Sequence, residues 1–199
     1  MSLTFTGTAM LAALISLAQI LGAPATLGGT DTQQSEEGPL LRPPSARMTA
    51  AAPMEAGSPQ SADTASLERE ILQSVNRFRT RRGLQPLTIN QKLVQVARVL
   101  CRSLMPVPAL SHTDPSGRGL AQRMSAAGIP YSIAAENLYR CTGCSSPGLS
   151  AVYRWSLSPG HLSNLIDPKV TETGVGVWQE GKTICVAQEF LCPPLLRRG

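Results

Sequence analysis

The chain has 199 residues, and its 42% of hydrophobic residues suffices for one folded domain with a non-globular extension. Its formal net charge is +5, but aromatic residues make up 4% of the sequence and no nucleic-acid-binding motif accompanies the basic residues. Nucleic-acid binding is therefore not expected, because such proteins normally combine their charge with a recognised motif or with stacking aromatics.

The first 25 residues are predicted to direct export. They contain no charged side chain, residues 9–21 are almost entirely apolar, and the run Ala23-Pro24-Ala25 resembles a signal cleavage site. No basic residue precedes the apolar run, so an uncleaved N-terminal anchor is the alternative, although the run is shorter than the ~20 residues of a membrane-spanning helix. We expect a protein that is secreted or held in the cell envelope.

Residues 26–65 are predicted to form a disordered linker, because they are rich in Ser, Thr, Ala, Pro and Gly and lack apolar periodicity. Five acidic and two basic residues give this linker a net charge of −3. Since residues 1–25 are uncharged, the remainder of the chain carries +8. This remainder comprises a predicted domain over residues 66–194 and a basic tail over residues 195–199. Its charge favours anionic surfaces such as envelope polymers or lipid headgroups.

Two amphipathic helices open the predicted domain. The first begins at Ser66, repeats apolar residues on one face and ends at Gly83. The basic run over residues 77–82 falls at its C-terminus, where cations are favourable. Asn90 is positioned to cap the second helix, and Pro106 stops it.

Shorter elements follow, and together they predict an α+β fold. In the strand at 173–178, Val175 and Val177 share one face while Gly174 and Gly176 share the other, a pattern that marks close approach by a backbone or a ligand. Helices on both sides of a small hairpin-based sheet predict a three-layer α-β-α sandwich. The predicted elements are a loop holding His112, a helix at 119–127, an extended segment at 134–139, a helix at 149–156, and strands at 173–178 and 183–190 joined by residues 179–182.

One of the two histidines follows a helix-start signal. Ser158 is suited to cap the helix, Pro159 to occupy its first position, and His161 then falls in the first turn. The partial positive charge of a helix N-terminus disfavours protonation of the imidazole. A neutral imidazole is the form that binds metals.

His112, Glu136 and His161 come from three separate elements and are the candidate site residues. Two imidazoles and a carboxylate form a suitable set of ligands for a divalent metal, zinc first. Gln188 either points into the same cleft or satisfies a strand edge. Asn137 and Asn164 are expected to fix loop geometry.

Eight motifs occur in the order found in the CAP superfamily, which includes cysteine-rich secretory proteins, antigen 5 and plant pathogenesis-related protein 1. The chain resembles the short, secreted bacterial form of this family. The resemblance implies an α-β-α sandwich with a central cleft, in which His112, Glu136 and His161 match three of four His/Glu cavity positions. The second glutamate has no clear counterpart, since the sequence after Trp155 reads Ser-Leu-Ser. The motifs are Asn76–Leu87, Asn90 with Leu93 and Ala97, Leu110–Asp114, Arg123–Gly128, Ala135–Leu138, Trp155–Asn164, Thr173–Val177 and Val186–Phe190.

Five cysteines in an exported chain suggest disulfides and leave one cysteine over. Cys141 and Cys144 can pair locally, whereas Cys185 and Cys192 have opposite strand parity and are not expected to bond to each other. These four are the disulfide candidates. Cys101, on the apolar second helix, is expected to be a buried free thiol.

The leading functional hypothesis is a secreted CAP module whose cleft binds a divalent metal or a small polar or lipid ligand, without obligatory catalysis. Two alternatives remain open. One is a metal-dependent hydrolase, a peptidase or esterase, in which the histidines hold zinc and Glu136 orients or deprotonates water. The other is an envelope adhesion module that uses its basic surface.

Overall fold

The computed structural model describes residues 62–195. The predicted signal segment, residues 26–61 of the predicted linker and the last four residues of the tail lie outside this range. The elements are α1 (Ala62–Thr80), β1 (Thr88–Ile89), α2 (Gln91–Leu104), α3 (Leu120–Ala126), β2 (Ile133–Thr142), α4 (Pro147–Leu157), α5 (Pro159–Ile166), β3 (Glu172–Glu180) and β4 (Thr183–Cys192).

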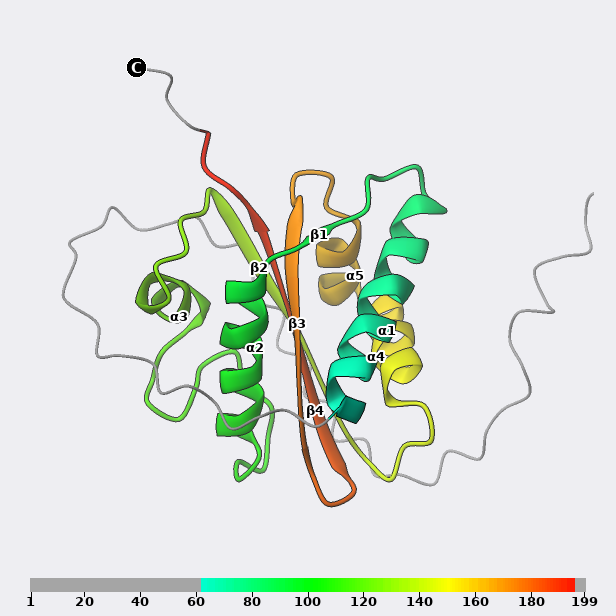
Figure 1. Cartoon of the computed structure of the whole chain (residues 1–199), viewed down its shortest axis with the longest axis vertical. Helices are drawn as coiled ribbons and strands as arrows, with labels where there is room; N and C mark the ends of the chain where they lie inside the picture. Colours follow the sequence, from blue (N-terminus) through cyan, green and yellow to red (C-terminus); the bar gives the residue numbers. More distant parts are fainter. Residues whose placement is uncertain (1–61, 196–199) are drawn as a thin grey trace, which may run out of the picture.

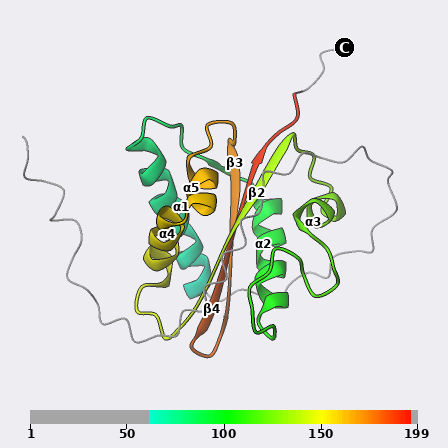
Figure 2. The same cartoon turned by 180° about the vertical axis from the view of Figure 1, so that it is seen from behind.

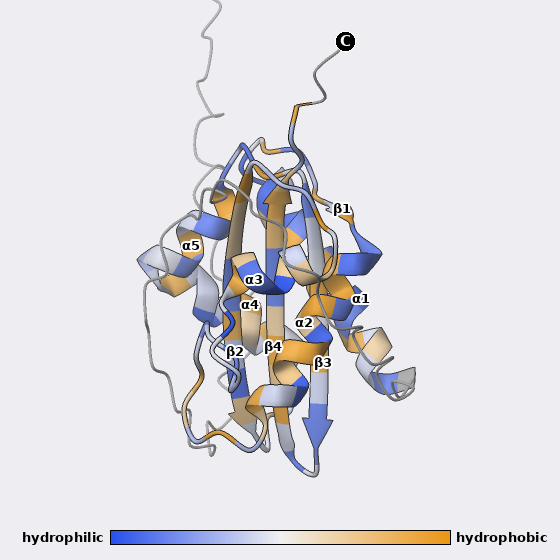
Figure 3. Cartoon of the chain, turned by 90° about the vertical axis from the view of Figure 1, so that its left-hand side faces the viewer, coloured by the Kyte–Doolittle hydropathy of each residue, from blue (hydrophilic) through white to orange (hydrophobic). Residues whose placement is uncertain are grey.

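The four strands form one mixed sheet in the order β1-β3-β4-β2. β1 pairs with β3 in parallel, and β4 pairs antiparallel with both β3 and β2. Helices α2 and α3 cover one face, and α1, α4 and α5 cover the other (Figures 1 and 2). This is the predicted three-layer α-β-α arrangement. Figure 3 views the α2 and α3 side and shows β4 between β2 and β3.

The glycines of β3 bring helix α2 close to the sheet. A Cβ atom at Gly174 would overlap backbone atoms of Leu93 and Val94, and one at Gly176 would overlap the backbone nitrogen of Arg98. The alternating glycines therefore mark close approach by another backbone, one of the two predicted alternatives. Val175 and Val177 point into the core on the opposite face.

Several predicted boundaries are corrected. Helix α1 begins at Ala62, four residues before Ser66, with Asp63 in its first turn where the helix dipole favours a negative charge. The predicted four-residue hairpin connection is shorter, because residues 179 and 180 pair with β4 and leave Gly181 and Lys182 as the turn. Gly181 has a φ of +56°, which suits glycine.

The two predicted N-caps behave differently. The side-chain oxygen of Asn90 accepts hydrogen bonds from the backbone nitrogens of Lys92 and Leu93, as predicted. Ser158 occupies the N-cap position of α5 with extended backbone, but its side chain makes no capping hydrogen bond within the described structure. Pro159 starts α5 as predicted, so the backbone preference of proline defines this helix start more than the serine hydroxyl does.

Candidate functional site

Glu136 lies on β2, with its side chain on the face covered by α2 and α3. Glu136 is 6% exposed, and the residue paired with it across the β2–β4 ladder is Glu189. Directly opposed residues of an antiparallel pair project to the same face with Cβ atoms roughly 5 Å apart. Two carboxyl groups therefore meet inside the protein at this point.

His112 lies on the loop between α2 and α3, as predicted, and its Nδ1 lies 2.7 Å from Oε1 of Glu136. An ionised carboxylate can only accept, so Nδ1 carries the proton and donates it to Glu136. The other ring nitrogen, Nε2, then carries a lone pair on the opposite side of the ring. The His112 side chain is 29% exposed, whereas that of Glu136 is 3% exposed.

Arg123 of α3 supplies the positive charge beneath this pair. Its side chain is 4% exposed, and its guanidinium donates to Oε2 of Glu136 and to the carbonyl oxygens of His112 and Arg118. One guanidinium therefore neutralises the carboxylate and fixes the backbone of the histidine loop.

Asp114 organises the same loop from within. Its carboxylate accepts from the backbone nitrogens of Ser116 and Arg118 at 2.9 and 3.0 Å, and from both of their side chains. Burial would raise the pKa of Asp114, but these hydrogen bonds and the charge of Arg118 hold it below its ordinary value. The loop that carries His112 is held by an ionised carboxylate.

Glu189 is the second carboxyl of the site and was not predicted. It is fully buried on β4, and its Oε1 lies 3.8 Å from Nη2 of Arg123. Burial, and next the negative charge of Glu136, raise its pKa well above the ordinary value. The raised pKa favours the neutral form of Glu189, which is the form that can donate a hydrogen bond to Glu136.

Glu136 has the opposite tendency. Burial alone would raise its pKa, but the hydrogen bond from His112 and the charge of Arg123 bring it below its ordinary value, with a further contribution from the Glu189 hydrogen bond. The site consequently holds one ionised carboxylate, one neutral carboxyl group and one guanidinium, with His112 as the member that reaches solvent.

His161 lies in the first turn of α5, as predicted, and is half-buried. Asn137 Nδ2 donates to its carbonyl oxygen at 3.1 Å, and Asn164 Nδ2 donates to Oδ1 of Asn137 at 2.9 Å. The two asparagines thus fix local geometry, as expected. The side chains of Glu136 and Asn137 point to opposite faces of β2, toward α3 and α5 respectively. Side chains from these two helices can therefore meet only around the outer edge of β2.

Gln188 does not fit one of its two predicted roles. It is fully buried on β4, a central strand, so it does not satisfy a sheet edge. Its Nε2 donates to Oγ1 of Thr173 at 3.2 Å. It pairs with Asn137 and therefore faces α5, on the side of the sheet opposite to Glu136. Its assignment to the ligand cleft stays a prediction.

Glu136 does not fit the role of zinc ligand. Both of its oxygens are engaged, one by His112 and one by Arg123, and a guanidinium beside the carboxylate opposes a second cation. Across residues 62–195, no group of three His, Cys, Asp or Glu side chains is arranged to hold a metal ion. Glu136 instead orients His112, and metal binding by His112 and His161 stays a prediction.

The predicted disulfide candidates separate into two kinds. Cys141 and Cys144 are bonded at the end of β2, with Cα atoms 6.1 Å apart. Cys185 and Cys192, the other two candidates, are free thiols in the structure, and Cys101 is a buried free thiol as predicted.

The fold and the His/Glu pair define the class of the protein as a CAP-type α-β-α sandwich. The sequence profile of the CAP family, described as the cysteine-rich secretory protein family, matches residues 72–190. The chain belongs to this family.

Several relatives are bacterial. The uncharacterized protein YkwD of Bacillus subtilis (strain 168) is 30% identical over 114 residues, which are 57% of this chain and 43% of that protein. A solved structure of an extracellular protein containing a SCP domain from Bacillus anthracis str. Ames is 25% identical, with a TM-score of 0.58, and the match covers 68% of this chain and 45% of that one. The chain thus spans less than half of each Bacillus relative.

A third match supports the fold. An outer surface protein from Borrelia burgdorferi has a TM-score of 0.60 at 20% identity, over 66% of this chain and 96% of that one. In the part of the chain that the structure covers, no helix is long and apolar enough to cross a membrane.

Proposed function

We propose that the chain is an exported CAP-domain module that binds a small polar ligand at His112, without obligatory catalysis. The observation that carries this proposal is the partly exposed imidazole held by a buried, ionised carboxylate. Because Nδ1 donates to Glu136, Nε2 offers a fixed acceptor to a hydrogen-bond donor or a ligand position to a metal ion. Export is supported by the apolar N-terminal segment and by the extracellular and outer-surface relatives.

The carboxyl groups favour binding over catalysis. A general base needs a pKa near the working pH and access to the proton that it removes. Glu136 has a lowered pKa and engages both oxygens, while Glu189 is neutral and fully buried. These groups are suited to hold His112 in position, because neither carboxyl is presented to a substrate.

The test uses the full-length chain with 15N-labelled histidine. The probes are zinc chloride, phosphate, acetate, acetamide and glucose. Since the chain has two histidines, His112→Gln and His161→Gln assign every ring resonance. We expect at least one probe to shift the Nε2 resonance of His112, and Glu136→Gln to weaken that binding by about tenfold or more, as loss of an orienting partner does at other sites.

The outcomes separate the candidate functions. If no probe shifts the His112 resonance, ligand binding at this histidine is wrong. If the purified chain cleaves peptides or esters, and both His112→Gln and Glu136→Gln abolish cleavage while preserving the fold, the hydrolase hypothesis replaces it. Retention on anionic vesicles that falls with salt, without any probe binding, would favour the adhesion hypothesis instead.

A further inference from the structure

Two of the free cysteines lie together in the core. Cys101 on α2 and Cys185 on β4 are both fully buried and belong to the same hydrophobic cluster, which also contains Leu138 and Ala187. Burial raises the pKa of the Cys101 thiol, and a hydrogen bond with the Cys185 thiol raises it further. The two thiols are therefore neighbours within one buried cluster.

The register of helix and strand explains why the two cysteines are neighbours. Gly174 packs against Leu93 and Gly176 packs against Ala97, so an advance of four residues along α2 corresponds to an advance of two residues along β3. The two advances have similar lengths, because four helical residues rise about 6 Å and two strand residues roughly 6.6 Å. One turn further, Cys101 reaches the level of Trp178, whose partner on β4 is Cys185.

The side chains of β4 complete the placement. Cys185 has the same strand parity as Ala187 and Glu189, so it projects toward α2. Cys101 Sγ lies 3.6 Å from the carbonyl oxygen of Gly176, which places it against the sheet. The absence of a side chain at Gly176 permits this approach, since a Cβ there would lie 2.6 Å from Cβ of Ala97.

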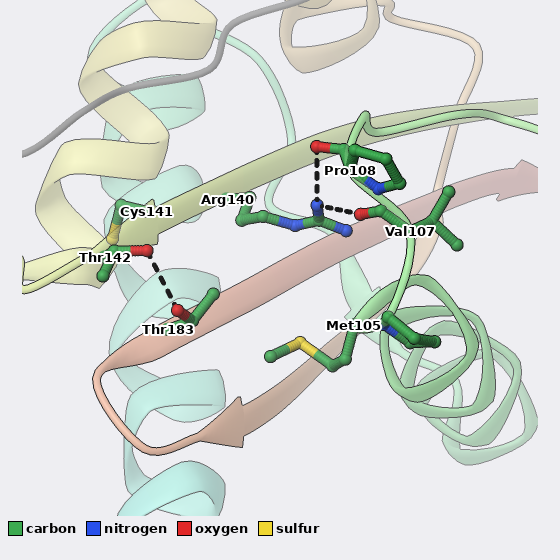
Figure 4. Close-up of a pocket in the computed structure, with 8 residues that line it drawn as sticks. Met105, Val107, Pro108, Arg140, Cys141, Thr142 and Thr183 are labelled. Carbon is green, nitrogen blue, oxygen red and sulfur yellow. Dashed lines mark hydrogen bonds between the residues drawn. The ribbon is translucent and has the colours of Figure 1, made fainter.

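Arg140 holds the C-terminal end of α2 over the same point. It pairs with Cys185 across the β2–β4 ladder, and its guanidinium donates to the carbonyl oxygens of Leu104, Val107 and Pro108. Figure 4 shows Arg140 reaching from β2 to the segment with Val107 and Pro108. These three residues line a pocket of about 330 Å³. The backbone around the two thiols is thus fixed by contacts independent of them.

We propose that Cys101 and Cys185 form a second disulfide that joins α2 to β4 when the protein folds in the presence of a disulfide oxidant. The thiolate of one cysteine attacks the oxidant, RSSR, and releases one RSH as a mixed disulfide forms. The second cysteine then displaces the other RSH. The two protein thiols lose two protons and two electrons in total, and the oxidant is reduced to two thiols.

Burial determines when this reaction occurs. The thiolate is the reactive species, and both thiols are inaccessible in the folded protein. Bond formation therefore accompanies folding, and the folded, reduced protein reacts slowly. The bond would close a long loop that contains the His112 loop, α3 and β2, and would thereby fix α2 against the strand that carries Glu189.

The test is oxidative refolding of the full 199-residue chain with glutathione disulfide, followed by a thiol count in denaturant and non-reducing peptide mapping. With Cys141–Cys144 also bonded, we expect one thiol in the oxidised wild type, namely Cys192. Cys192→Ala, the matched control, should leave none, and Cys101→Ala should leave two. Closing so long a loop should raise Tm by about 10 °C above that of oxidised Cys101→Ala.

The result that overturns the proposal is three thiols in the oxidised wild type, or a map that joins Cys101 or Cys185 to any other cysteine. The map uses the wild-type chain, so it decides the matter even if Cys101→Ala fails to fold. Folded, reduced wild type that reacts with glutathione disulfide as fast as unfolded chain would contradict the role given to burial.

Discussion

Replacement of Glu189 by glutamine tests the charge state of the buried carboxyl pair. Glu189→Gln keeps the shape of the side chain and makes it permanently neutral. Because burial and the charge of Glu136 raise the pKa of Glu189 well above its ordinary value of 4.5, the folded protein already favours its neutral form. The substitution should therefore leave the packing of β4 almost unchanged and alter the pH dependence of stability.

The direction and size of this change in the pH dependence of stability follow from proton linkage. Above its unfolded pKa, Glu189 is ionised in the unfolded chain but still protonated in the folded one, so unfolding releases a proton. A rise in pH then favours the unfolded chain, by about 1.4 kcal/mol for each pH unit. Wild type should therefore lose stability relative to Glu189→Gln, at up to this slope, from above the unfolded pKa of Glu189 until the pH reaches its raised folded pKa. Glu136 acts in the opposite direction, since its lowered pKa contributes stability that is lost as pH falls through its folded pKa.

The assay is urea unfolding at constant ionic strength from pH 5 to pH 8, followed by tryptophan fluorescence, to which the 1% exposed Trp155 contributes. The quantity of interest is the free energy of unfolding of Glu189→Gln minus that of wild type, compared at equal m-values. Titration of groups that do not interact with Glu189 cancels in this difference. The control is Glu180→Gln, because Glu180 is exposed near the turn of the same hairpin.

We expect the difference to increase with pH for Glu189→Gln and to stay constant for Glu180→Gln. If the difference for Glu189→Gln does not change across this range, the carboxyl is not protonated in the folded protein. In that case Glu189 is ionised in both the folded and the unfolded chain, and our account of the charges around Arg123 is wrong.

Three further substitutions test the structure by urea unfolding. Arg123→Met should cost about 3–5 kcal/mol, because it leaves the carboxylate of Glu136 buried without its cation, and a loss below about 1 kcal/mol would contradict this role. Gly176→Ala should lower the free energy of unfolding by about 1–3 kcal/mol or more, because the added Cβ meets the backbone of α2. In the control Gly181→Ala the added Cβ meets nothing within 4 Å, so the loss should be only about 1 kcal/mol. Equal losses for the two variants would refute close packing of α2. Arg79→Met should lower the free energy of unfolding by about 3 kcal/mol, because the 1% exposed arginine side chain donates to carbonyl oxygens around the α5–β3 connection. If the variant is as stable as wild type, water replaces these hydrogen bonds.

Much of the fold could be predicted because it depends on local patterns. Apolar spacing identified α1 and α2, the amide of Asn90 defined the start of α2, and the alternating glycines of β3 indicated a close contact. The two-residue strand β1 was missed, since it exists only through its pairing with β3. Arg79 looked like one cation of a helix C-terminus, but its carbonyl partners Leu165 and Val170 are distant in sequence.

The site was predicted in part. The resemblance and the residue types pointed to His112 and Glu136, and the structure brings them together. Glu189 was missed, although its strand parity, opposite to that of Gln188, was a usable signal. That signal acquires meaning only with the strand register, which places Glu189 directly across from Glu136.

The sequence by itself determined the helices and the longer strands, the turn at Gly181, the loop around Asp114 and the local Cys141–Cys144 bond, because each depends on interactions between residues near one another in the chain. Only the tertiary structure decided which side of the sheet each residue faces, and hence that Gln188 faces away from Glu136 while Glu189 and Arg123 enter the site. It also decided the charges, since burial and neighbours, rather than residue type, make Glu136 an anion and Glu189 a neutral acid.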